Sequence, residues 1–567
     1  MEKVVATGVQ DYAKLIEDGS FFVDKTNFIR EWWSSRDEVT LITRPRRFGK
    51  TLNLSMLNYF FSNKYQGRSD LFEGMNVWKD EAFHALQGSY PVIFLTFADV
   101  KAESWEDARE FMNDLISTLY DGYEDMMQDP MFSEADRKKF YRVGSDMRNP
   151  TAAVSLRNLC GWLHRYYGKK VLIFLDEYDT PMQEAWINGY WKKMTAYVRS
   201  LFNSTFKTNP HLERALMTGI TRVSKESIFS DLNNLKVITA TSWKYETAFG
   251  FTEQEVFDAM EAQGCTEQEK TDVKEWYDGF NFGRVTDIYN PWSVTNYLSE
   301  RRLKAWWANS SSNQLIGKLL QQGNAGMKTQ MENLLKGENL LLPIDEEIVY
   351  NQLDDNPEAV WSLMLTAGYL KVVRDPTRAK GLGEGSVLYN LTITNRETRD
   401  TIEDLVKGWF KKKRDYVVPD LINQLLRGRA EDAEDYLNRL LRNTISYFDP
   451  GTPEDAPESF YHGLVLGMIV ERMEDYHIWS NRESGYGRYD VVMEPKDRKQ
   501  PAVILEFKTF HPDREKTLEE AAGNALKQIE DRQYDTELLT RGIPAENIHK
   551  YGIAFKGKIC SVRMSCD

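Results

Sequence analysis

The stretch TLITRPRRFGKTLNLSML, residues 40–57, gives the strongest indication of the fold. A short apolar run leads into a basic loop, and Gly49-Lys50-Thr51 then opens a helical pattern. This order is typical of a phosphate-binding loop, in which backbone N–H groups at a helix N-terminus bind the anion, the lysine reaches the outer phosphates and the hydroxyl meets Mg²⁺. The general pattern has a glycine five residues before Gly49, where this chain has Arg44.

A second motif supports a nucleotide site. In VLIFLDEYDTP, residues 171–181, an apolar strand pattern ends at Asp176-Glu177. In phosphate-loop NTPases a carboxylate at this point holds Mg²⁺, and the next glutamate polarises the attacking water. Taken alone, Asp176-Glu177 is equally well explained as a polar strand end. Lys50-Thr51 upstream favours a site that binds ATP and Mg²⁺.

Apolar runs alternate with helical patterns from residue 1 to about residue 245. This alternation predicts an α/β domain with a parallel sheet and crossover helices. The last run ends at Thr221-Arg222, where an arginine and a polar residue are candidates for sensing the outer phosphate; a surface loop is an equally good interpretation. The expected strands cover residues 38–44, 90–97, 170–176 and 213–220.

The rest of the chain divides at a linker. Residues 449–459, DPGTPEDAPES, contain three prolines within a short span, which is typical of a domain boundary. The pattern before the linker is more helical and suggests a lid or winged-helix region followed by a helical connector. We therefore expect four regions, at residues 1–250, 251–400, 401–450 and 451–567.

Composition limits the function classes. The chain has 567 residues and a net charge of −14, which disfavours a surface coated with nucleic-acid-binding charge but allows a local basic groove. We see no signal peptide and no apolar run long enough to span a membrane. Four cysteines without a C-x-x-C pair are too few for a disulfide framework, so we expect buried thiols in a cytoplasmic protein.

A second group of charged residues follows the linker, in GYGRYDVVMEPKDRKQPAVILEFKTF, residues 485–510. Two strand patterns flank a polar turn. If the turn is centred near residue 498, paired residue numbers sum to about 996, and Asp490 faces Glu506. Lys508 lies two residues after Glu506 and shares its face of the strand.

Two carboxylates held together beside apolar strands need a cation, and a divalent metal ion is the natural one. A metal between Asp490 and Glu506 would activate water for attack on a phosphodiester, and Lys508 would orient the water or stabilise the developing charge. Glu458, at the start of an apolar helical pattern, is a candidate third ligand. An exposed hairpin with a Glu–Lys pair is the alternative, and such a pair contributes little.

These segments resemble a known family. The chain looks like the AAA-ATPase-like proteins that carry a C-terminal PD-(D/E)XK nuclease domain, common in bacteria and their mobile elements. In that family the loop usually reads Arg-Pro-Arg-Arg-Phe-Gly-Lys-Thr, so Arg44 fits the family pattern. The matching stretches include FFVDKTNFI, TLITRPRRFGKTLNLSML, VLIFLDEYDTP, MTGITRV, WYDGFNFG, IYNPWSV, FYHGLVLGMI, SNRESGYGRYDVVMEP and AVILEFK.

The resemblance implies a P-loop domain, a middle region and a restriction-endonuclease-like αβββαβ domain. It implies that ATP binds at the loop, where Arg44 either crowds the phosphates or holds them. The remaining residues implied for the nucleotide site are Arg46, Arg47, Gly49, Lys50, Thr51, Asp176, Glu177 and Arg222.

The resemblance also implies a nuclease centre made by Asp490, Glu506 and Lys508. Glu458 is the candidate helical acid, with Glu454 and Asp455 as alternatives. Related nucleases have a helical glutamine followed by a tyrosine. Gln528 and Tyr534 are candidates for this pair, although their spacing exceeds the usual four residues.

The main hypothesis is an ATP-regulated nuclease that needs Mg²⁺ or Mn²⁺ and acts on DNA, with RNA as an alternative substrate and defence or mobile-element biology as its context. Homo-oligomers are consistent with the AAA resemblance. A nucleotide-gated switch that binds nucleic acid without cleaving it is the alternative, and an ATP-driven transposition or recombination factor is a third hypothesis.

Overall fold

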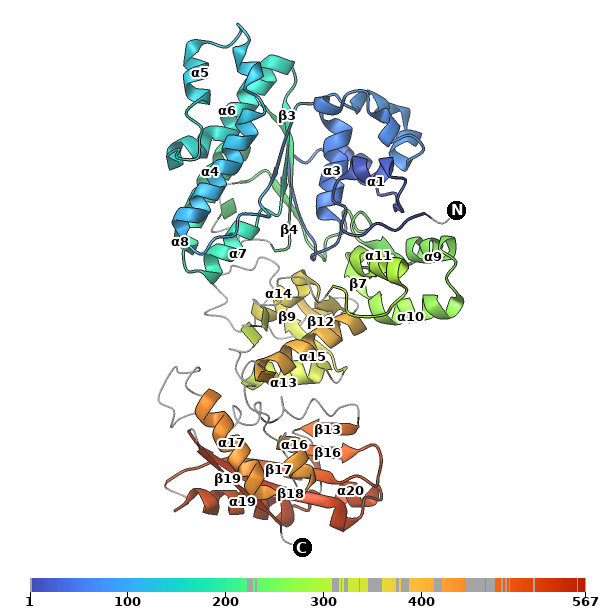
Figure 1. Ribbon diagram of the computed structural model, residues 1–567, viewed down its shortest axis with the longest axis vertical. Coiled ribbons are helices and arrows are strands. Elements are labelled where there is room, and N and C mark those ends of the chain that lie inside the picture. Colours follow the sequence, from blue (N-terminus) through green and yellow to red (C-terminus); the bar gives the residue numbers. More distant parts are fainter. Residues whose placement is uncertain are drawn as a thin grey trace. The chain divides into compact units, whose positions relative to one another are not determined.

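The protein forms two compact units, which we describe separately from a computed structural model (Figure 1). One unit contains residues 1–320 and 333–401, and the other contains residues 321–332 and 402–567. The structure describes all residues except 1–2, 222–227, 230–231, 308–315, 318, 321–324, 336, 345–358, 374–376, 379–386, 412–420, 445–464, 466–474, 481–482, 485–486, 489, 513–514, 558 and 566–567.

A five-stranded parallel sheet organises the N-terminal unit, in the order β2-β3-β4-β1-β5. Every residue of β1 and β3 is buried, as expected for a parallel sheet covered by helices on both faces. The predicted parallel sheet is confirmed, with β5 as a further edge strand. The strands are β1 (Val39–Thr43), β2 (Val92–Thr96), β3 (Val171–Asp176), β4 (Leu212–Gly219) and β5 (Leu235–Ile238).

Helices cover both faces of this sheet. Figure 1 shows α4, α6 and α8 on one side and α1 and α3 on the other. The core beneath α3 is rich in aromatic rings, including Trp32, Phe60, Phe61 and Phe174. The helices are α1 (Tyr12–Glu17), α2 (Asn27–Ser35), α3 (Lys50–Phe61), α4 (Trp105–Asp121), α5 (Glu134–Phe140), α6 (Asn149–Tyr167), α7 (Thr180–Ile187) and α8 (Trp191–Phe206).

A small helical region follows the sheet in the same unit. Helices α9 and α10 each begin with a capping box, in which a threonine and the glutamate three residues later satisfy each other's backbone N–H groups. The elements are β6 (Phe251–Thr252), α9 (Glu253–Ala262), α10 (Glu267–Tyr277), β7 (Phe280–Phe282), β8 (Val285–Tyr289) and α11 (Pro291–Glu300), with the strands in the order β6-β8-β7.

The elements from α13 to α15, which belong partly to each unit, combine helices with a small antiparallel sheet. Helix α14 is buried and runs into β10, and β9, β10 and β11 all pair with β12. The elements are α13 (Ala325–Leu335), β9 (Leu340–Pro343), α14 (Ala359–Ala367), β10 (Leu370–Val372), β11 (Thr377–Arg378), β12 (Val387–Ile393) and α15 (Arg396–Lys411).

The C-terminal unit contains a mixed five-stranded sheet in the order β13-β16-β17-β18-β19. Only β17 and β18 pair in parallel, and α19 lies between them in the chain. This arrangement fits the predicted restriction-endonuclease-like fold. The elements are α16 (Leu421–Leu426), α17 (Ala430–Thr444), β13 (Tyr476–Ser480), β14 (Glu483–Ser484), β15 (Gly487–Arg488), β16 (Val491–Pro495), β17 (Ala502–Thr509), α19 (Leu518–Asp531), α20 (Thr536–Thr540), β18 (Ile548–Lys556) and β19 (Ile559–Met564).

Strand alternation gives this sheet two faces. Val503 and Leu505 pack with α16 and α17, which lie within the predicted connector region, whereas Ala502 and Ile504 pack with α19 and α20. Because successive side chains of a strand point to opposite faces, Glu506 and Lys508 lie on the α19 face. The helix predicted to begin near Glu458 lies outside the described residues, apart from Val465, which is buried in the α16–α17 core.

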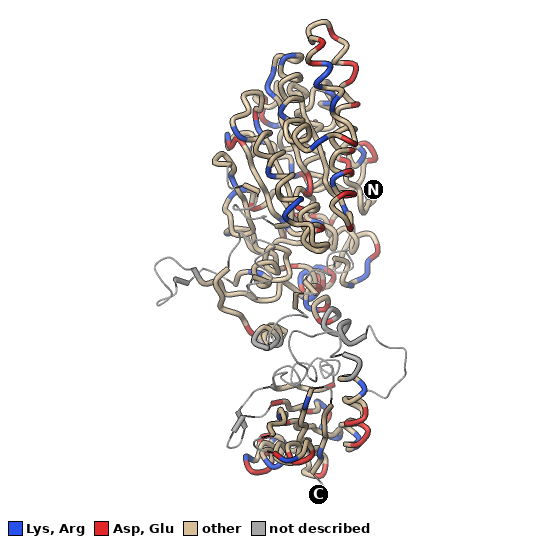
Figure 2. The backbone as a smooth tube through the Cα atoms, turned by 90° about the vertical axis from the view of Figure 1, so that its left-hand side faces the viewer, with Lys and Arg blue, Asp and Glu red and all other residues tan. Residues whose placement is uncertain are grey.

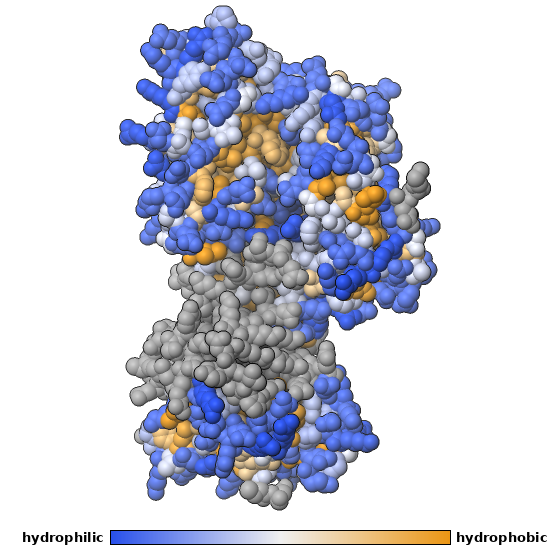
Figure 3. Space-filling view, in the orientation of Figure 1, coloured by the Kyte–Doolittle hydropathy of each residue, from blue (hydrophilic) through white to orange (hydrophobic). Residues whose placement is uncertain are grey.

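The described surface is predominantly hydrophilic and mixed in charge. Basic and acidic residues alternate along the chain in both units (Figure 2), in keeping with 72 basic and 86 acidic residues in the whole sequence. Apolar residues gather in more than one area of the N-terminal unit on the face seen in Figure 3, the broadest near its middle. Within the described residues, we find no helix with the length and apolar character needed to cross a membrane.

Candidate functional site

The phosphate loop connects β1 to α3. Gly49 has a φ of 76°, in the left-handed region that favours glycine, and α3 begins at the next residue. The side chain of Lys50 is buried, and its Nζ donates hydrogen bonds to the carbonyl oxygens of Arg44 (3.1 Å) and Pro45 (2.9 Å). Burial lowers the pKa of Lys50, and the charge of Glu177 opposes this shift. The lysine therefore lies across the loop, close to the acids at the end of β3.

The predicted magnesium ligands lie together. Thr51 Oγ1 donates to Asp176 Oδ2 at 2.6 Å, and Thr218 Oγ1 donates to Asp176 Oδ1 at 2.6 Å. Thr218 reaches the carboxylate because β4 lies between β1 and β3 in the sheet. Burial raises the pKa of Asp176, while its hydrogen bonds with the two hydroxyls act in the opposite direction. A hydroxyl and a carboxylate so placed match the oxygen ligands that Mg²⁺ prefers.

Glu177 follows Asp176 in a left-handed backbone conformation, with a φ of 49°. The side chains of the two acids differ in burial: Asp176 is buried, whereas Glu177 is half-exposed. Glu177 accepts a hydrogen bond from Thr180 Oγ1 at 3.3 Å. The predicted water-polarising glutamate thus lies at the accessible side of the site. Arg222, the predicted sensor arginine, lies outside the described residues.

Asp179 is a buried acid that the sequence analysis does not identify. Its Oδ2 accepts hydrogen bonds from the backbone N–H groups of Ile220 (2.9 Å) and Thr221 (2.8 Å) and from Thr221 Oγ1 (3.0 Å). A side chain at Gly219 would place its Cβ 2.6 Å from Asp179 Oδ1, so the close approach requires glycine. Asp179 therefore ties the segment after β3 to the end of β4. Its position just beyond a strand end is the signal that could have identified it.

Arg44, one of the predicted nucleotide-site residues, makes its contacts inside the protein. This side chain is fully buried, and its guanidinium donates to the carbonyl oxygens of Thr43 (2.9 Å), Thr239 (2.8 Å) and Tyr245 (3.3 Å). The guanidinium also lies over the ring of Phe282, 4.4 Å from the ring centroid. The guanidinium of Arg44, a candidate phosphate ligand, is therefore in contact with carbonyl oxygens and an aromatic ring. Arg44 thus holds the loop to the segment after β5.

Arg46 and Arg47 lie nearer the surface of the loop. Arg46 is half-exposed, and its Nη2 lies 3.5 Å from Gln183 Oε1 on α7. Arg47 is exposed, and its guanidinium stacks 4.1 Å from the ring centroid of Trp292. Of the three arginines in the loop, these two are therefore accessible to a bound phosphate.

The predicted strand register in the C-terminal unit is confirmed. Val491 pairs with Leu505, Val492 with Ile504 and Met493 with Val503, and each pair of residue numbers sums to 996. Asp490, immediately before β16, therefore lies opposite Glu506. Its Oδ2 accepts a hydrogen bond of 2.7 Å from the backbone N–H of Phe507.

Gln528 and Tyr534 join this site. Gln528 Nε2 donates to Glu506 Oε1 and lies 3.5 Å from Tyr534 Oη. Arg532 Nη1 donates to the same Tyr534 oxygen at 3.2 Å. These contacts connect the buried carboxylate of Glu506 to the exposed guanidinium of Arg532. The sequence analysis did not identify Arg532. The contacts form despite the six-residue spacing of Gln528 and Tyr534 because α19 ends at Asp531, and the chain turns before Tyr534.

Close packing of α19 on β18 brings Gln528 to Glu506. Gly552 on β18 pairs with Glu506 on β17, and a Cβ at Gly552 would lie 2.2 Å from the carbonyl oxygen of Ala522. Only a glycine allows the helix backbone this close to the sheet. Lys508 is half-exposed two residues after Glu506. Glu458 and its alternatives Glu454 and Asp455 lie outside the described residues.

Two regions of the chain match known family models. Residues 6–229 match the sequence model described as predicted AAA-ATPase, and residues 456–564 match that of the PD-(D/E)XK nuclease superfamily. One region of the chain is thus similar to AAA-ATPases and another to the PD-(D/E)XK nuclease superfamily, in the predicted order. An uncharacterized protein encoded in the vnfD 5′ region of Azotobacter chroococcum mcd 1 is 24% identical, over 98% of this chain and 96% of the relative. This similarity therefore extends over both regions of the chain that match a family model.

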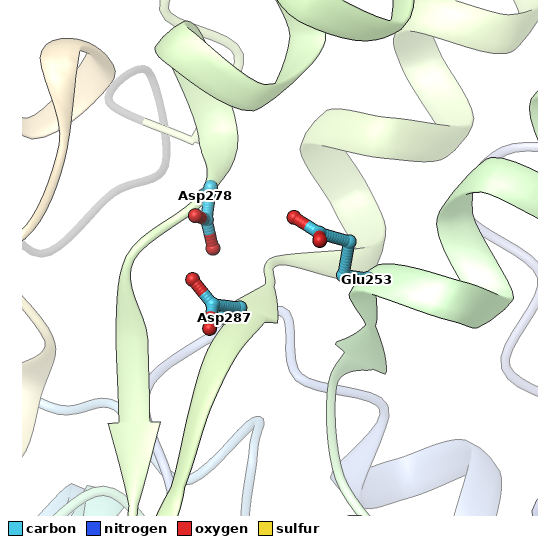
Figure 4. A group of neighbouring side chains, drawn as sticks. All are labelled: Glu253, Asp278 and Asp287. Atoms are coloured by element: carbon cyan, nitrogen blue, oxygen red, sulfur yellow. The ribbon is translucent and has the colours of Figure 1, made fainter.

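The N-terminal unit also has an acidic cluster that the sequence analysis missed. Glu253, Asp278 and Asp287 place carboxylate oxygens within 4.8 Å of one another, and Figure 4 shows the side chains pointing toward a common space. Lys274 forms an ion pair with Glu253. Burial, aided by the charge of Asp287, raises the pKa of Asp278 to about 7. A neutral Asp278 and the lysine reduce the repulsion within this cluster.

Proposed function

We propose that the protein is an ATP-binding, metal-dependent nuclease in which the AAA-like domain regulates phosphodiester cleavage by the C-terminal domain. The two family matches support an ATPase and a nuclease. The observation that carries the proposal is the placement of Asp490 opposite Glu506, with Gln528 bound to the glutamate. DNA is the proposed substrate, and Mg²⁺ or Mn²⁺ the proposed metal.

The carboxylate oxygens of Asp490 and Glu506 fit a hard divalent cation. Such a cation would lower the pKa of a bound water and neutralise charge on the phosphodiester. Phe507 and Gln528 orient the two acids by hydrogen bonds from a backbone N–H and a side-chain amide. Lys508, on the same strand face as Glu506, is positioned to stabilise the developing negative charge. Glu458 is the proposed third acid.

In the N-terminal domain, ATP would bind with its phosphates at the start of α3. The backbone N–H groups after Gly49 and the ammonium of Lys50 favour negative charge there. Thr51 and Asp176 would hold Mg²⁺, and Glu177 would orient the attacking water. Arg46 and Arg47 supply accessible positive charge. In this proposal Arg44 contributes to the loop's structure rather than to phosphate binding.

A cleavage assay with a single substitution tests the nuclease assignment. The intact chain would be incubated with supercoiled plasmid, single-stranded DNA or RNA in Mg²⁺ or Mn²⁺, beside Asp490→Asn. We expect metal-dependent cutting that Asp490→Asn reduces at least about a thousandfold, as for loss of a group that acts in the transition state. Equal products from both proteins would contradict the assignment. Binding without cutting by either protein would favour the nucleotide-gated switch.

A further inference from the structure

The phosphate loop is held from outside by two side chains distant in sequence. Both donate hydrogen bonds to the carbonyl oxygen of Arg46: Asn290 Nδ2 at 3.3 Å and Trp307 Nε1 at 3.1 Å. Both donors are buried. The backbone of the loop at Arg46 is therefore anchored to the small helical region, independently of the contacts that its side chain makes.

A second set of hydrogen bonds also holds the side chain of Asn290 in place. Its Oδ1 accepts hydrogen bonds from the backbone N–H groups of Trp292 (2.9 Å) and Ser293 (3.3 Å), which makes it the N-cap of α11. Pro291 occupies the first helical position, which suits its fixed φ. The amide can therefore move only with the start of α11.

Glu397 connects these two anchors. Its carboxylate accepts hydrogen bonds from Ser293 Oγ (2.8 and 3.0 Å) and from the backbone N–H of Trp307 (2.5 Å). Glu397 is only 1% exposed. A buried carboxylate is costly unless it is hydrogen-bonded. Hence Glu397 holds the start of α11 and Trp307 together, and both contact the phosphate loop.

Glu397 lies in the first turn of α15, and the chain passes from the first compact unit to the second within this helix, between Thr401 and Ile402. Two further contacts connect the phosphate loop to the segment that leads into α15. Pro45 of the phosphate loop lies so close to Gly368 that a Cβ there would be 2.9 Å from its ring, and Thr394 Oγ1 donates to the Gly368 carbonyl at 2.8 Å. The loop and the segment leading into α15 are thus packed together.

We propose that Glu397 is a positioning residue that links the nucleotide state of the phosphate loop to the start of α15, the helix through which the chain enters the C-terminal unit. This inference rests on the proposed nucleotide site.

The sign of the coupling follows from the hydrogen bonds. Phosphates that accept hydrogen bonds from loop N–H groups polarise the adjoining peptide groups, and polarised carbonyls accept hydrogen bonds more strongly. Nucleotide binding therefore strengthens the contacts of the Arg46 carbonyl with Asn290 and Trp307. Since coupling is reciprocal, releasing Trp307 from Glu397 weakens nucleotide binding.

Hydrogen exchange on the intact chain, with and without Mg²⁺ and adenylyl imidodiphosphate, tests this link. In the wild type we expect nucleotide to slow exchange in peptides covering residues 40–57 and 396–401. Glu397→Leu removes every acceptor atom at this position, and in this variant we expect slowing to persist at 40–57 and to vanish at 396–401, with nucleotide affinity reduced about fivefold. Glu275→Gln is the matched control, because Glu275 forms an exposed ion pair with Arg396 in the same helical turn. It should behave as the wild type.

Each outcome decides the proposal. Slowing at 396–401 that survives in Glu397→Leu, or that is missing in the wild type although 40–57 responds, would overturn the link and leave the nucleotide site intact. A wild type with no response at 40–57 and no measurable nucleotide binding would overturn the nucleotide site itself. Should Glu397→Leu fold poorly, Ser293→Ala removes one hydrogen bond to the carboxylate and should reduce the response at 396–401 in part.

Discussion

Thr51 and Asp176 are 125 positions apart in the chain, yet their side-chain oxygens lie 2.6 Å apart. The contact arises because a helix begins where one buried parallel strand ends, and an acid follows the end of another. At the residue scale, these two groups and the Asp490–Glu506 pair carry the proposed chemistry. Each is held by hydrogen bonds from residues outside its own motif, which are Thr218 in the first site and Gln528 in the second.

Replacing Thr51 with valine should remove the part of nucleotide affinity that depends on magnesium. The hydroxyl is lost both as a metal ligand and as a donor to Asp176, and we expect ATP to bind roughly tenfold more weakly with Mg²⁺. Affinity in EDTA should change little. Titration of fluorescent nucleotide measures both values.

Thr40→Val is the matched control. Thr40 lies on β1, and its buried hydroxyl has no hydrogen-bond partner among the described residues, so the same substitution removes no contact. If Thr51→Val and Thr40→Val have the same affinities with Mg²⁺, the role proposed for Thr51 is wrong.

Gln528→Ala should slow cleavage about 10- to 100-fold, the usual cost of losing a residue that orients a metal ligand. ATP affinity should be unchanged, since Gln528 contacts groups of the nuclease domain. Asn524→Ala shortens an exposed amide on the same helix and serves as the control. Cleavage rates of Gln528→Ala that match those of Asn524→Ala would exclude a positioning role for Gln528.

At the element scale, the strands and one register follow from the sequence. Buried apolar runs bounded by polar residues predicted β1 to β4, and the polar turn near residue 498 predicted the pairing of β16 with β17. Local patterns work here because a strand and its turn are local. The contacts of Arg44, by contrast, have no local signal, because its acceptors at Thr239 and Tyr245 are about 200 positions away. The roles of Trp307 and Glu397 likewise have no local signal.

Helix α19 offers a direct test of how packing positions the nuclease residues. In Gly552→Ala the new methyl group would meet the helix backbone at 2.2–2.3 Å, so α19 must move away from β18. We expect a loss of about 2–4 kcal/mol in unfolding free energy and a strong fall in cleavage. Urea unfolding and plasmid cleavage measure the two effects.

Gly523→Ala is the opposite substitution on the same helix. A Cβ at Gly523 meets no atom within 4 Å, so alanine should raise stability by about 0.5–1 kcal/mol through helix propensity. If Gly552→Ala were as stable as Gly523→Ala, the tight packing of α19 on β18 would be wrong.

At the scale of the whole molecule, buried acids make stability depend on pH. Burial raises the pKa of Glu397 to about 7, from an ordinary value of 4.5. Between these values the folded protein binds more protons than the unfolded chain, so this contribution is complete below pH 4.5 and is lost as pH rises through 7. Asp278, with a pKa of about 7, acts in the same direction.

Glu397→Gln isolates one of these contributions. From pH 5 to pH 8 the wild type should lose about 2 kcal/mol more than the variant, because each pKa unit is worth about 1.4 kcal/mol. Denaturant midpoints at the two pH values give this difference, and other titrating groups cancel in the comparison. Parallel pH dependence in both proteins would show that Glu397 does not titrate as its burial implies.

The central claim is that one chain joins a nucleotide site to a nuclease centre that it regulates. The most direct measurement is the rate of plasmid cleavage in Mg²⁺ or Mn²⁺, with and without ATP, for the wild type, Lys50→Ala and Asp490→Asn. We predict that ATP changes the wild-type rate, that Lys50→Ala still cuts but does not respond to ATP, and that Asp490→Asn does not cut under either condition. Cutting by Asp490→Asn, or an unchanged ATP response in Lys50→Ala, would contradict the account.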